Sequence, residues 1–310
     1  MRTRLLITAT VLVAFGVASA SAGVLIPPTL ILGGPEYQLY ANSNGTYLGW
    51  TQNSTGRPRA FHAYVSIDSG QTKNRINPPG TQGWFGDIDN DSNEAVYQQT
   101  DGAVSDLYVV PDVSDPSVQT GLAVPNTTKW EWQPRLSDEY VMFAREYPRL
   151  DANRLFLYDR DTQGLTLLRE LSFRHSLFAG DVGSLYATWT TCRRTCAAWI
   201  YTIDTQELTR IPTVNGKHQY APVVDEVHGT AYWVRSGDTC GQNVGIWTAP
   251  LDSLSTPTRI GALPRGIDTE WKASLEYDTV NGRIDFIFPR YNCRRGDANI
   301  YELQGVDTLP

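Results

Sequence analysis

The chain has 310 residues, with 33 acidic and 26 basic side chains, and its formal charge is −7. This acidic balance argues against nucleic acid and anionic membrane surfaces as partners, because both attract an excess of cations. Nine Trp and sixteen Tyr residues, together with scarce helical periodicity, favour packed β-sheets. One large all-β domain can account for the length.

The beginning of the chain has the pattern of a secretory signal peptide. Two arginines precede the apolar run LLITATVLVAFGVASA, and alanines follow at every second position up to Ala22. Cleavage after Ala20 or Ala22 fits this pattern. A retained anchor is the alternative, although the run is short for a membrane-spanning helix. We therefore expect residues 1–22 to be removed and residues 23–310 to be secreted, to the extracellular space or the periplasm, without membrane insertion.

Six segments of alternating apolar and polar residues then recur with a period in the mid-forties. They read TYLGWTQ, EAVYQQ, EYVMFAR, SLYATWT, GTAYWVR and RIDFIFP. Each is followed by another run that ends in a polar turn, as in HAYVSIDSGQ, RLFLYDRDTQG and AWIYTIDTQE. A repeat of this length, with three or four short strands per unit, is typical of a propeller blade. The sequence therefore predicts an all-β, six-bladed β-propeller.

The two ends of the chain are expected to meet in the last blade. The final unit ends at NIYELQGVDTLP, which leaves no room for a fourth strand. We expect residues 29–32 to supply it, because this pairing closes the ring and removes an open sheet edge. A frayed N-terminal tail is the alternative. The blades of this single domain are then expected at approximately residues 34–80, 81–127, 128–171, 172–214, 215–264 and 265–310.

The third unit resembles a known family of repeats. The segments PRLSDEYVMFA (134–144) and NRLFLYDRDTQGLTLL (153–168) are similar to the TolB-type, WD-like propeller repeat, in which a Pro–x–Ser–Pro–Asp–Gly turn precedes a strand and an aspartate hairpin follows. Most other units lack the Asp–Gly turn. The resemblance implies a six-bladed propeller that serves as a binding or scaffolding module, although a fold alone does not establish a function.

The four cysteines fall in loops that join the second and third strands of blades four, five and six. These loops lie on one face of a propeller, which we call the loop face. An exported chain oxidises its thiols, and pairing Cys192 with Cys196 and Cys240 with Cys293 joins near neighbours, whereas the two other pairings must skip blade five. A four-thiolate zinc site is the alternative, but the spacing of the outer two cysteines does not suit it.

The same loops are rich in arginine. They hold eleven of the twenty arginines that follow the signal segment and no lysine. Because guanidinium groups bind carboxylate or phosphate in a planar, bidentate manner, we expect an anionic partner to dock there; solvated arginines or pairs within each loop are the alternative. The eleven are Arg57, Arg59, Arg145, Arg149, Arg154, Arg193, Arg194, Arg235, Arg290, Arg294 and Arg295.

Two short motifs offer other readings. The segment DIDNDSNE resembles a calcium loop through Asp87, Asp89 and Asp91, but it lacks the glycine and the final glutamate of that loop. The segment SIDSGQTK (66–73) is similar to the Asp box of sialidases, with lysine in place of its tryptophan. We interpret both segments as propeller turns, in which Asp and Asn are ordinary residues.

A third cluster is expected where the innermost strands begin, at the mouth of a central channel. Glu131 and Glu270 occupy matched positions beside Trp132 and Trp271. Two carboxylates next to aromatic rings can support glycoside hydrolysis, with His175 and His218 nearby. Acids and aromatics at a channel rim also serve simply to satisfy backbone groups and to pack.

These patterns favour a secreted, monomeric binding or scaffolding module without a cofactor or a metal. Its expected partner is a protein or an anionic glycan that docks on the Arg-rich loop face. The alternative is a secreted carbohydrate-active enzyme, such as a glycoside hydrolase, a lyase or a sialidase-like protein, with its site at the channel mouth. No hydrolase nucleophile motif or phosphate-binding glycine loop occurs in the sequence.

Overall fold

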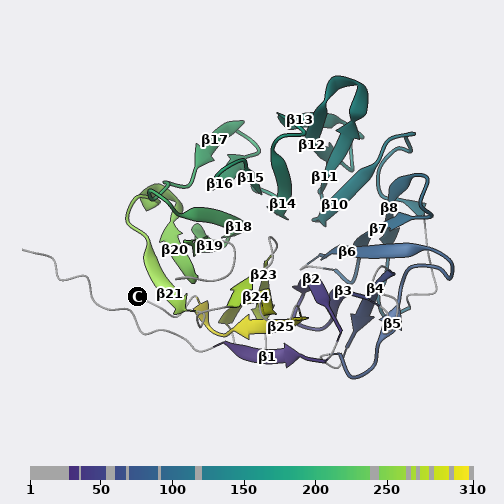
Figure 1. Cartoon of the computed structure of the whole chain (residues 1–310), viewed down its shortest axis with the longest axis horizontal. Helices are drawn as coiled ribbons and strands as arrows, with labels where there is room; N and C mark the ends of the chain where they lie inside the picture. The colour runs from purple at the N-terminus through teal and green to yellow at the C-terminus, as the bar shows by residue number, and fades with distance from the viewer. Residues whose placement is uncertain are drawn as a thin grey trace, which may run out of the picture.

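The computed structural model describes residues 28–34, 36–53, 60–67, 70–89, 92–115, 121–237, 244–262, 267–269, 273–278, 283–292 and 297–306. Its strands form six antiparallel sheets of four or five strands, which are arranged as a ring around a common axis (Figure 1). The predicted six-bladed β-propeller is therefore confirmed. Within the described residues, no helix is long and apolar enough to cross a membrane.

Five blades consist of four consecutive strands, with the first strand near the axis and the fourth at the rim (Figure 1). Blade 1 contains β2 (Gln38–Ser43), β3 (Leu48–Asn53), β4 (Phe61–Ser66) and β5 (Asn74–Arg75). Blade 2 contains β6 (Gln82–Ile88), β7 (Ala95–Thr100), β8 (Ser105–Val110) and β9 (Gly121–Leu122). Blade 3 contains β10 (Glu131–Leu136), β11 (Tyr140–Tyr147), β12 (Ala152–Asp159) and β13 (Leu165–Ser172), with the short helix η1 (Pro148–Leu150) between β11 and β12.

The next two blades repeat this order. Blade 4 contains β14 (Ser176–Val182), β15 (Tyr186–Cys192), β16 (Cys196–Thr202) and β17 (Glu207–Arg210). Blade 5 contains β18 (His218–Asp225), β19 (Thr230–Ser236), β20 (Gly245–Pro250) and β21 (Thr258–Ala262), with the short helix η2 (Leu251–Ser253) before β21.

The sixth blade joins the two ends of the chain. Its inner edge is divided into β22 (Ile267–Thr269) and β23 (Ser274–Asp278), which both pair with β24 (Arg283–Asn292). β24 pairs with β25 (Asp297–Leu303), and β1 (Thr29–Leu32) adds antiparallel to β25 as the outermost strand. Figure 1 shows this pairing as the purple β1 beside the yellow β25. The N-terminal segment thus covers the edge that β25 would otherwise expose.

The second strand of each blade places a large aromatic side chain in the core. These side chains are among the largest that are fully buried, and they come from the six alternating segments of the repeat: Trp50, Tyr97, Phe143, Trp189, Trp233 and Phe286. Several pack on an aromatic ring of the third strand, as Trp50 does on Tyr64 with a centroid distance of 5.7 Å. Each buried ring contributes about 1.5–3 kcal/mol, so these residues hold the blades together.

The first strands of blades 1 to 5 share a bulge near their midpoints. Their registers are irregular at matching positions, and Tyr40, Gln133 and Ala221 have φ angles of 53°, 52° and 50° there. In blade 4, a Cβ at Gly180 would lie 2.7 Å from the carbonyl oxygen of Pro222 in the next blade. Only glycine allows the two blades to approach so closely.

Candidate functional site

Two cavities lie along the axis, one toward each face. The larger has a volume of about 420 Å³ and is lined by the first halves of inner strands and by the connections around them. The smaller, about 260 Å³, is lined by the ends of inner strands and the turns that follow them. Because strands alternate in direction within a blade, the first is on the loop face and the second is on the opposite face. We call them the loop-face cavity and the acidic cavity.

Aromatic side chains line the loop-face cavity from three neighbouring blades. Trp84 lies on β6, Trp132 on β10 and Phe178 on β14. Trp130 and Phe173 come from the connections that lead into β10 and β14, and Phe173 is 41% exposed. Small-molecule sites are typically concave and lined by apolar rings with a few polar groups, and this cavity has that composition.

Three of its polar side chains come from one face of blade 3. Glu146 of β11 is directly opposite Asn153 of β12, so both side chains project from the same face of the sheet. Trp132 of β10 is opposite Ala144, two residues from Glu146, and therefore shares that face. All three residues line the cavity, which places a carboxyl, an amide and an indole N–H on one wall.

Two of these polar groups are buried and have no hydrogen-bond partner. They are the indole Nε1 of Trp132 and the amide oxygen Oδ1 of Asn153. Unsatisfied buried polar atoms are uncommon because each costs about 1–3 kcal/mol. One is a donor and the other is an acceptor, and neighbouring protein atoms cover both of them.

The acid and the histidine of the cavity have different environments. Burial raises the pKa of the Glu146 carboxyl above its ordinary value. His175, at the turn before β14, lies with Nδ1 3.2 Å from the hydroxyl of Ser172. Burial therefore favours the protonated form of the Glu146 carboxyl.

The expected catalytic acid Glu131 lies outside the cavity lining and is held in an ion pair. Its Oε1 is 2.6 Å from Nη2 and 2.8 Å from Nε of Arg145, and both side chains are buried. Thr127 donates a further hydrogen bond of 3.2 Å to the same oxygen. Burial raises the pKa of Glu131, while Arg145 and the hydrogen bonds oppose this change. The pair joins β10 to β11, and Oε1 of the carboxylate is held by Arg145 and Thr127.

The loop arginines are in three kinds of environment. Arg145 and Arg154 form ion pairs within blade 3, Arg154 with Glu170 at 2.5 Å. Arg235 is buried and lies 4.2 Å from the ring centre of Trp247, and Arg290 lies 4.8 Å from that of Tyr301. The exposed arginines of the described loops are Arg149, Arg193 and Arg194.

A disulfide forms the loop-face hairpin of blade 4. Cys192 and Cys196 are bonded, as predicted, and are directly opposite in the register of β15 and β16. Arg193 and Arg194 therefore extend from a closed turn of the chain. The predicted site residue His218 lies behind this turn, where its Nδ1 accepts a hydrogen bond of 3.2 Å from the backbone N–H of Cys196.

Several predicted residues fall outside the part of the chain that the structure describes. The predicted Cys240–Cys293 bridge and the proposed partner carboxylate Glu270 are among them. The remaining ones are Arg57, Arg59, Asp91, Trp271, Arg294 and Arg295.

The acidic cavity on the opposite face has a different chemistry. Its lining includes five carboxylates, those of Asp87, Asp89, Asp138, Asp181 and Glu226, together with amide and hydroxyl side chains. Backbone N–H groups of residues 184, 185 and 186 donate to the last of these acids, and burial raises its pKa.

One buried arginine separates the two cavities. Arg135 lies between Pro134, which lines the loop-face cavity, and Leu136, which lines the acidic cavity. Its side chain is 1% exposed, and Nη1 is 3.3 Å from the Asp87 carboxylate. Nη1 and Nη2 also donate to the backbone oxygens of Gly86 and of residue 273, at 3.2 and 3.4 Å. Side chains from several blades thus meet at the axis.

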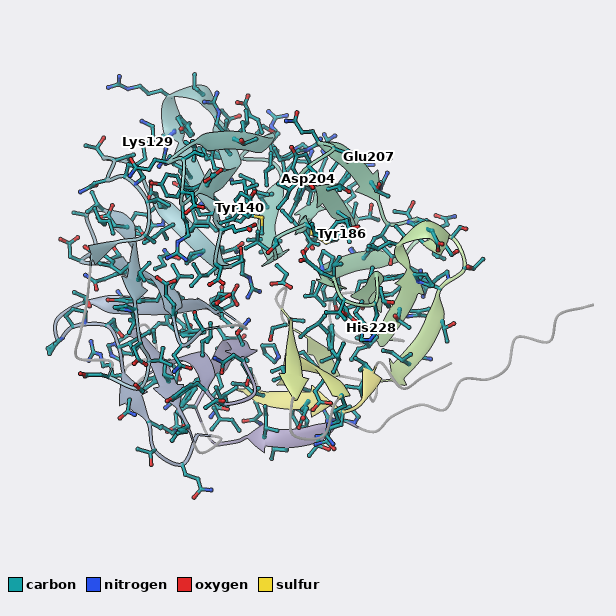
Figure 2. The ribbon with its side chains drawn as sticks, turned by 180° about the vertical axis from the view of Figure 1, so that it is seen from behind. Lys129, Tyr140, Tyr186, Asp204, Glu207 and His228 are labelled. Carbon is teal, nitrogen blue, oxygen red and sulfur yellow. A yellow bond between two sulfur atoms is a disulfide. The ribbon has the colours of Figure 1, made fainter. Side chains whose placement is uncertain are left out.

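The acidic character continues outward between blades 3 and 4. Figure 2 shows Tyr140, Tyr186 and Asp204 from these two blades. Burial raises the pKa of the Tyr140 hydroxyl, and the nearby carboxylates of Glu139, Asp159 and Asp204 raise it further. On the face opposite the loop face, carboxylates therefore lie both inside the cavity and beside it.

The segment that resembles a calcium loop is described in part, and its Asp87 contacts protein groups. Besides Arg135, Asp87 accepts hydrogen bonds from the side chain of Asn42 and from the backbone N–H of Leu136, the latter at 3.0 Å. Among the described residues, no three His, Cys, Asp or Glu side chains are grouped so that they could hold a metal ion. Asp87 thus binds protein groups at the axis.

Sequence patterns indicated part of this site. Trp132 and His175 were recognised as entries to the inner strands, and they do line the loop-face cavity. Glu146 and Asn153 were not singled out, although both lie between Arg145 and Arg154, two of the predicted loop arginines. The available signal was the cross-strand pairing of these two residues, which depends on the hairpin register.

Solved structures of other proteins have a similar fold. A structure described as TolB from Agrobacterium tumefaciens matches with a TM-score of 0.58 at 14% identity, over 89% of this chain and 93% of that chain. TolB from Acinetobacter baumannii matches with a TM-score of 0.54 at 9% identity, over 84% of this chain and 64% of that chain. An oligogalacturonate lyase in complex with manganese matches with a TM-score of 0.51 at 13% identity, over 89% and 85%. No protein-family model and no curated protein sequence matches the chain.

Proposed function

We propose that this chain, which has the fold of TolB-type six-bladed propellers, is a binding module that docks a protein or glycan partner on its loop face. The observation that carries the proposal is the presence, on that one face, of the 420 Å³ cavity and of the exposed Arg149, Arg193 and Arg194. Concave aromatic sites bind ligands, and arginine is enriched where proteins recognise anionic or planar groups.

The rim of the cavity supports this proposal. Phe173 is 41% exposed and Leu150 is 58% exposed, and the backbone N–H of Phe173 donates to Asp151 of the neighbouring loop at 3.1 Å. Exposed apolar groups of this size next to arginine are typical of recognition surfaces. The docking partner would cover them.

The proposal includes secretion of the chain from the cytoplasm. Residues 1–22 have the sequence of an export signal, and the Cys192–Cys196 disulfide is of a kind that persists in oxidising compartments. Both observations support secretion into the extracellular space or the periplasm. A partner would then be an envelope or extracellular molecule.

The docking face can be tested by charge-matched variants. The probes are immobilised heparin and immobilised polygalacturonate, from which the purified chain is eluted by salt. We expect Arg193→Gln/Arg194→Gln to elute at lower salt than the unmodified chain, because two exposed cations of the loop face are lost. The control, Arg160→Gln/Arg283→Gln, removes two charges from the opposite face and should elute unchanged. Unchanged elution of the loop-face variant would refute docking on this face.

A carbohydrate-active enzyme is the second candidate, and one observation favours it. Glu146 lines an aromatic cavity and burial raises its pKa, which suits a general acid. The similarity of this chain in fold to an oligogalacturonate lyase makes glycosides and uronides the substrates to test. Turnover that is lost in Glu146→Gln, with the fold retained, would support the enzyme. The same turnover in Glu146→Gln would exclude this residue as the acid.

A further inference from the structure

Two arginines lie against one tryptophan ring at the boundary between blades 3 and 4. The Cζ atom of Arg169, on β13, is 5.2 Å from the ring centre of Trp199, on β16. The Cζ atom of Arg210, on β17, is 5.5 Å from the same ring centre. The two guanidinium groups are therefore brought together on one aromatic platform, to which each is attracted by a cation–π interaction.

The strand register explains how the two arginines meet. Arg210 is directly opposite Trp199 in the pairing of β16 with β17, so both side chains project from the same face of blade 4. Arg169 is opposite Leu155 in the pairing of β12 with β13, and Leu155 belongs to the core cluster against which Trp199 packs. Arg169 therefore projects from blade 3 toward the face of blade 4 that carries the tryptophan.

Neither guanidinium group has a polar partner within the part of the chain that the structure describes. Other arginines that lie on rings do have one, since Arg145 and Arg154 form ion pairs and Arg235 donates to a glutamine at 3.2 Å. Arg210 is exposed and Arg169 is partly exposed. Two like charges on one ring repel each other. An anionic ligand would remove this repulsion and supply the acceptors that both groups lack.

The donors that a ligand can reach are the terminal ones. Nε of Arg169 is buried without a partner, whereas its Nη1 and Nη2 are not buried. These two nitrogens form the outer edge of the guanidinium plane, which is the edge that binds a carboxylate in a bidentate manner. Arg210 is exposed as a whole, so its guanidinium edge is accessible as well.

The arginine pair continues the loop face of blade 4. The indole Nε1 of Trp199 donates to the hydroxyl of Thr191 at 2.9 Å, and Thr191 directly precedes Cys192 of the disulfide hairpin. Arg193 and Arg194 extend from that hairpin and are exposed. Arginines are thus present from the hairpin turn to the boundary with blade 3.

The groups at this boundary favour one class of anion. In an acidic polysaccharide with a carboxylate on each sugar unit, neighbouring charges are separated by the apolar surface of a pyranose ring. The boundary likewise combines two guanidinium groups with apolar surface, because Leu208 is 39% exposed and projects from the same face of β17 as Arg210. A short run of uronate units therefore fits both the charges and the apolar surface.

We propose that Arg169 and Arg210, held on Trp199, form a subsite for an acidic polysaccharide, in which each guanidinium group binds a carboxylate in a bidentate manner. This inference rests on the proposed docking function and narrows its partner to a glycan. The same glycan chain then extends along the blade boundary to Arg193 and Arg194.

The test is calorimetric titration of the full chain with defined probes. The probes are trigalacturonate, its methyl ester, in which the same rings carry no charge, and an acetylated and amidated triglutamate. We expect trigalacturonate to bind more tightly than the other two. Arg169→Gln/Arg210→Gln should raise its Kd roughly tenfold, because two charge-assisted contacts are lost. The variant should keep its fold, which thermal unfolding checks, because neither arginine has a polar partner among the described residues.

Two further variants separate this subsite from a general effect of charge. Arg160→Gln/Arg283→Gln removes the same number of charges from the opposite face, and it should leave Kd unchanged. Arg169→Lys/Arg210→Lys keeps both charges but removes the planar, bidentate groups, so it should still raise Kd several-fold. An unchanged Kd in the lysine variant would show that charge alone acts at this boundary and would overturn the bidentate subsite.

The outcomes distinguish this subsite from the docking proposal. If trigalacturonate does not bind, or if its methyl ester or the triglutamate binds as tightly, the polysaccharide subsite is overturned. If Arg169→Gln/Arg210→Gln leaves Kd unchanged whereas Arg193→Gln/Arg194→Gln raises it, the subsite fails and docking on the loop face stands. If trigalacturonate binds and neither pair of substitutions changes its Kd, both proposals fail.

Discussion

The two cavities at the propeller axis share the inner strands of blades 1 to 4 and yet have opposite character. On the loop face, the first halves of the inner strands contribute Trp84, Trp132 and Phe178 to an aromatic cavity, and no described residue of its lining is an arginine or a lysine. On the other face, the ends of the same strands contribute Asp87 and Asp181, and the cavity is acidic. One sequence repeat therefore produces two chemically distinct cavities, because each inner strand runs from one face to the other.

The division between the mouths depends on a single side chain. Arg135 is buried at the level of the bulge and binds Asp87, and its charge lowers the pKa of Asp181, which burial raises. Without this cation, the carboxylates near the axis would face one another uncompensated. The axis of this propeller is thus an ion-paired core with a cavity at each end.

The largest expected effect comes from removing this cation. Arg135→Met should lower the free energy of unfolding by about 3–5 kcal/mol, because it leaves Asp87 buried without its ion partner. The measurement is urea denaturation. Arg160→Met in the same blade is the control, since the ion pair of Arg160 with Glu94 is partly exposed and should cost about 1 kcal/mol or less. Equal costs for both variants would show that Arg135 does not stabilise the axis.

The ion pair on the loop face gives the next effect. Glu131→Ala should lower the free energy of unfolding by about 3 kcal/mol, because Arg145 remains buried without its carboxylate. Contacts of Arg145 with the rings of Phe143 and Phe156, at 5.1 and 5.4 Å, retain part of its stabilisation. Glu170→Ala breaks an exposed pair with Arg154 in the same blade and should cost no more than about 1 kcal/mol. Urea denaturation measures the free energy of unfolding of both variants. A larger loss for Glu131→Ala than for Glu170→Ala would show that Glu131 stabilises the sheet, and equal losses would contradict this role.

The disulfide of the loop-face hairpin should contribute less. It closes a loop with a sequence separation of 4, for which the chain-entropy estimate is about 2 kcal/mol. Cys192→Ser/Cys196→Ser should therefore lower the free energy of unfolding by up to that amount in guanidinium titrations. The same variant should weaken retention on the anionic matrices, because Arg193 and Arg194 lose their closed turn. Unchanged retention would show that the bridge does not organise these arginines.

The smallest effect is a pH dependence at the acidic mouth. Burial raises the pKa of Glu226 above its ordinary value of 4.5, so the folded chain holds this proton more tightly than the unfolded chain. Stability from this group is present at low pH and falls as pH rises from about 4.5 through the folded pKa. Glu226→Gln should flatten that fall in a series of urea titrations, whereas Glu207→Gln, at an exposed position of blade 4, should not. An unchanged slope for Glu226→Gln would place the pH dependence elsewhere.

Much of the fold could be predicted because its signals are local. Each repeat carries an aromatic residue in its second strand, such as Trp50, Trp189 or Trp233, and these side chains are fully buried. The bridge between Cys192 and Cys196 could also be predicted, since it spans one short hairpin. The TolB-like fold inferred from segment 134–144 agrees with the structural neighbours.

The site was harder to predict because its contacts depend on register. The sequence offered Glu131 as a candidate acid at a channel mouth, with a purely structural role as the alternative, and only the pairing of β10 with β11 shows that it is opposite Arg145. Glu146 and Asn153 each look ordinary in the sequence, and only their alignment across the β11–β12 hairpin brings them to one wall. Sequence spacing does not specify which side chains face each other across strands.

The amino-acid sequence by itself determined the number of blades, the aromatic core of each blade, the loop that carries the cysteine pair and the arginine content of one face. Those features follow from hydrophobic alternation and spacing within a single repeat. Only the tertiary structure decided that Asp87 and Arg135, 48 residues apart, form an ion pair at the axis, and that Trp132 and Asn153 line one cavity. The reason is physical: hydrophobic burial selects the blades locally, whereas strand register and the packing of neighbouring blades select which polar groups meet.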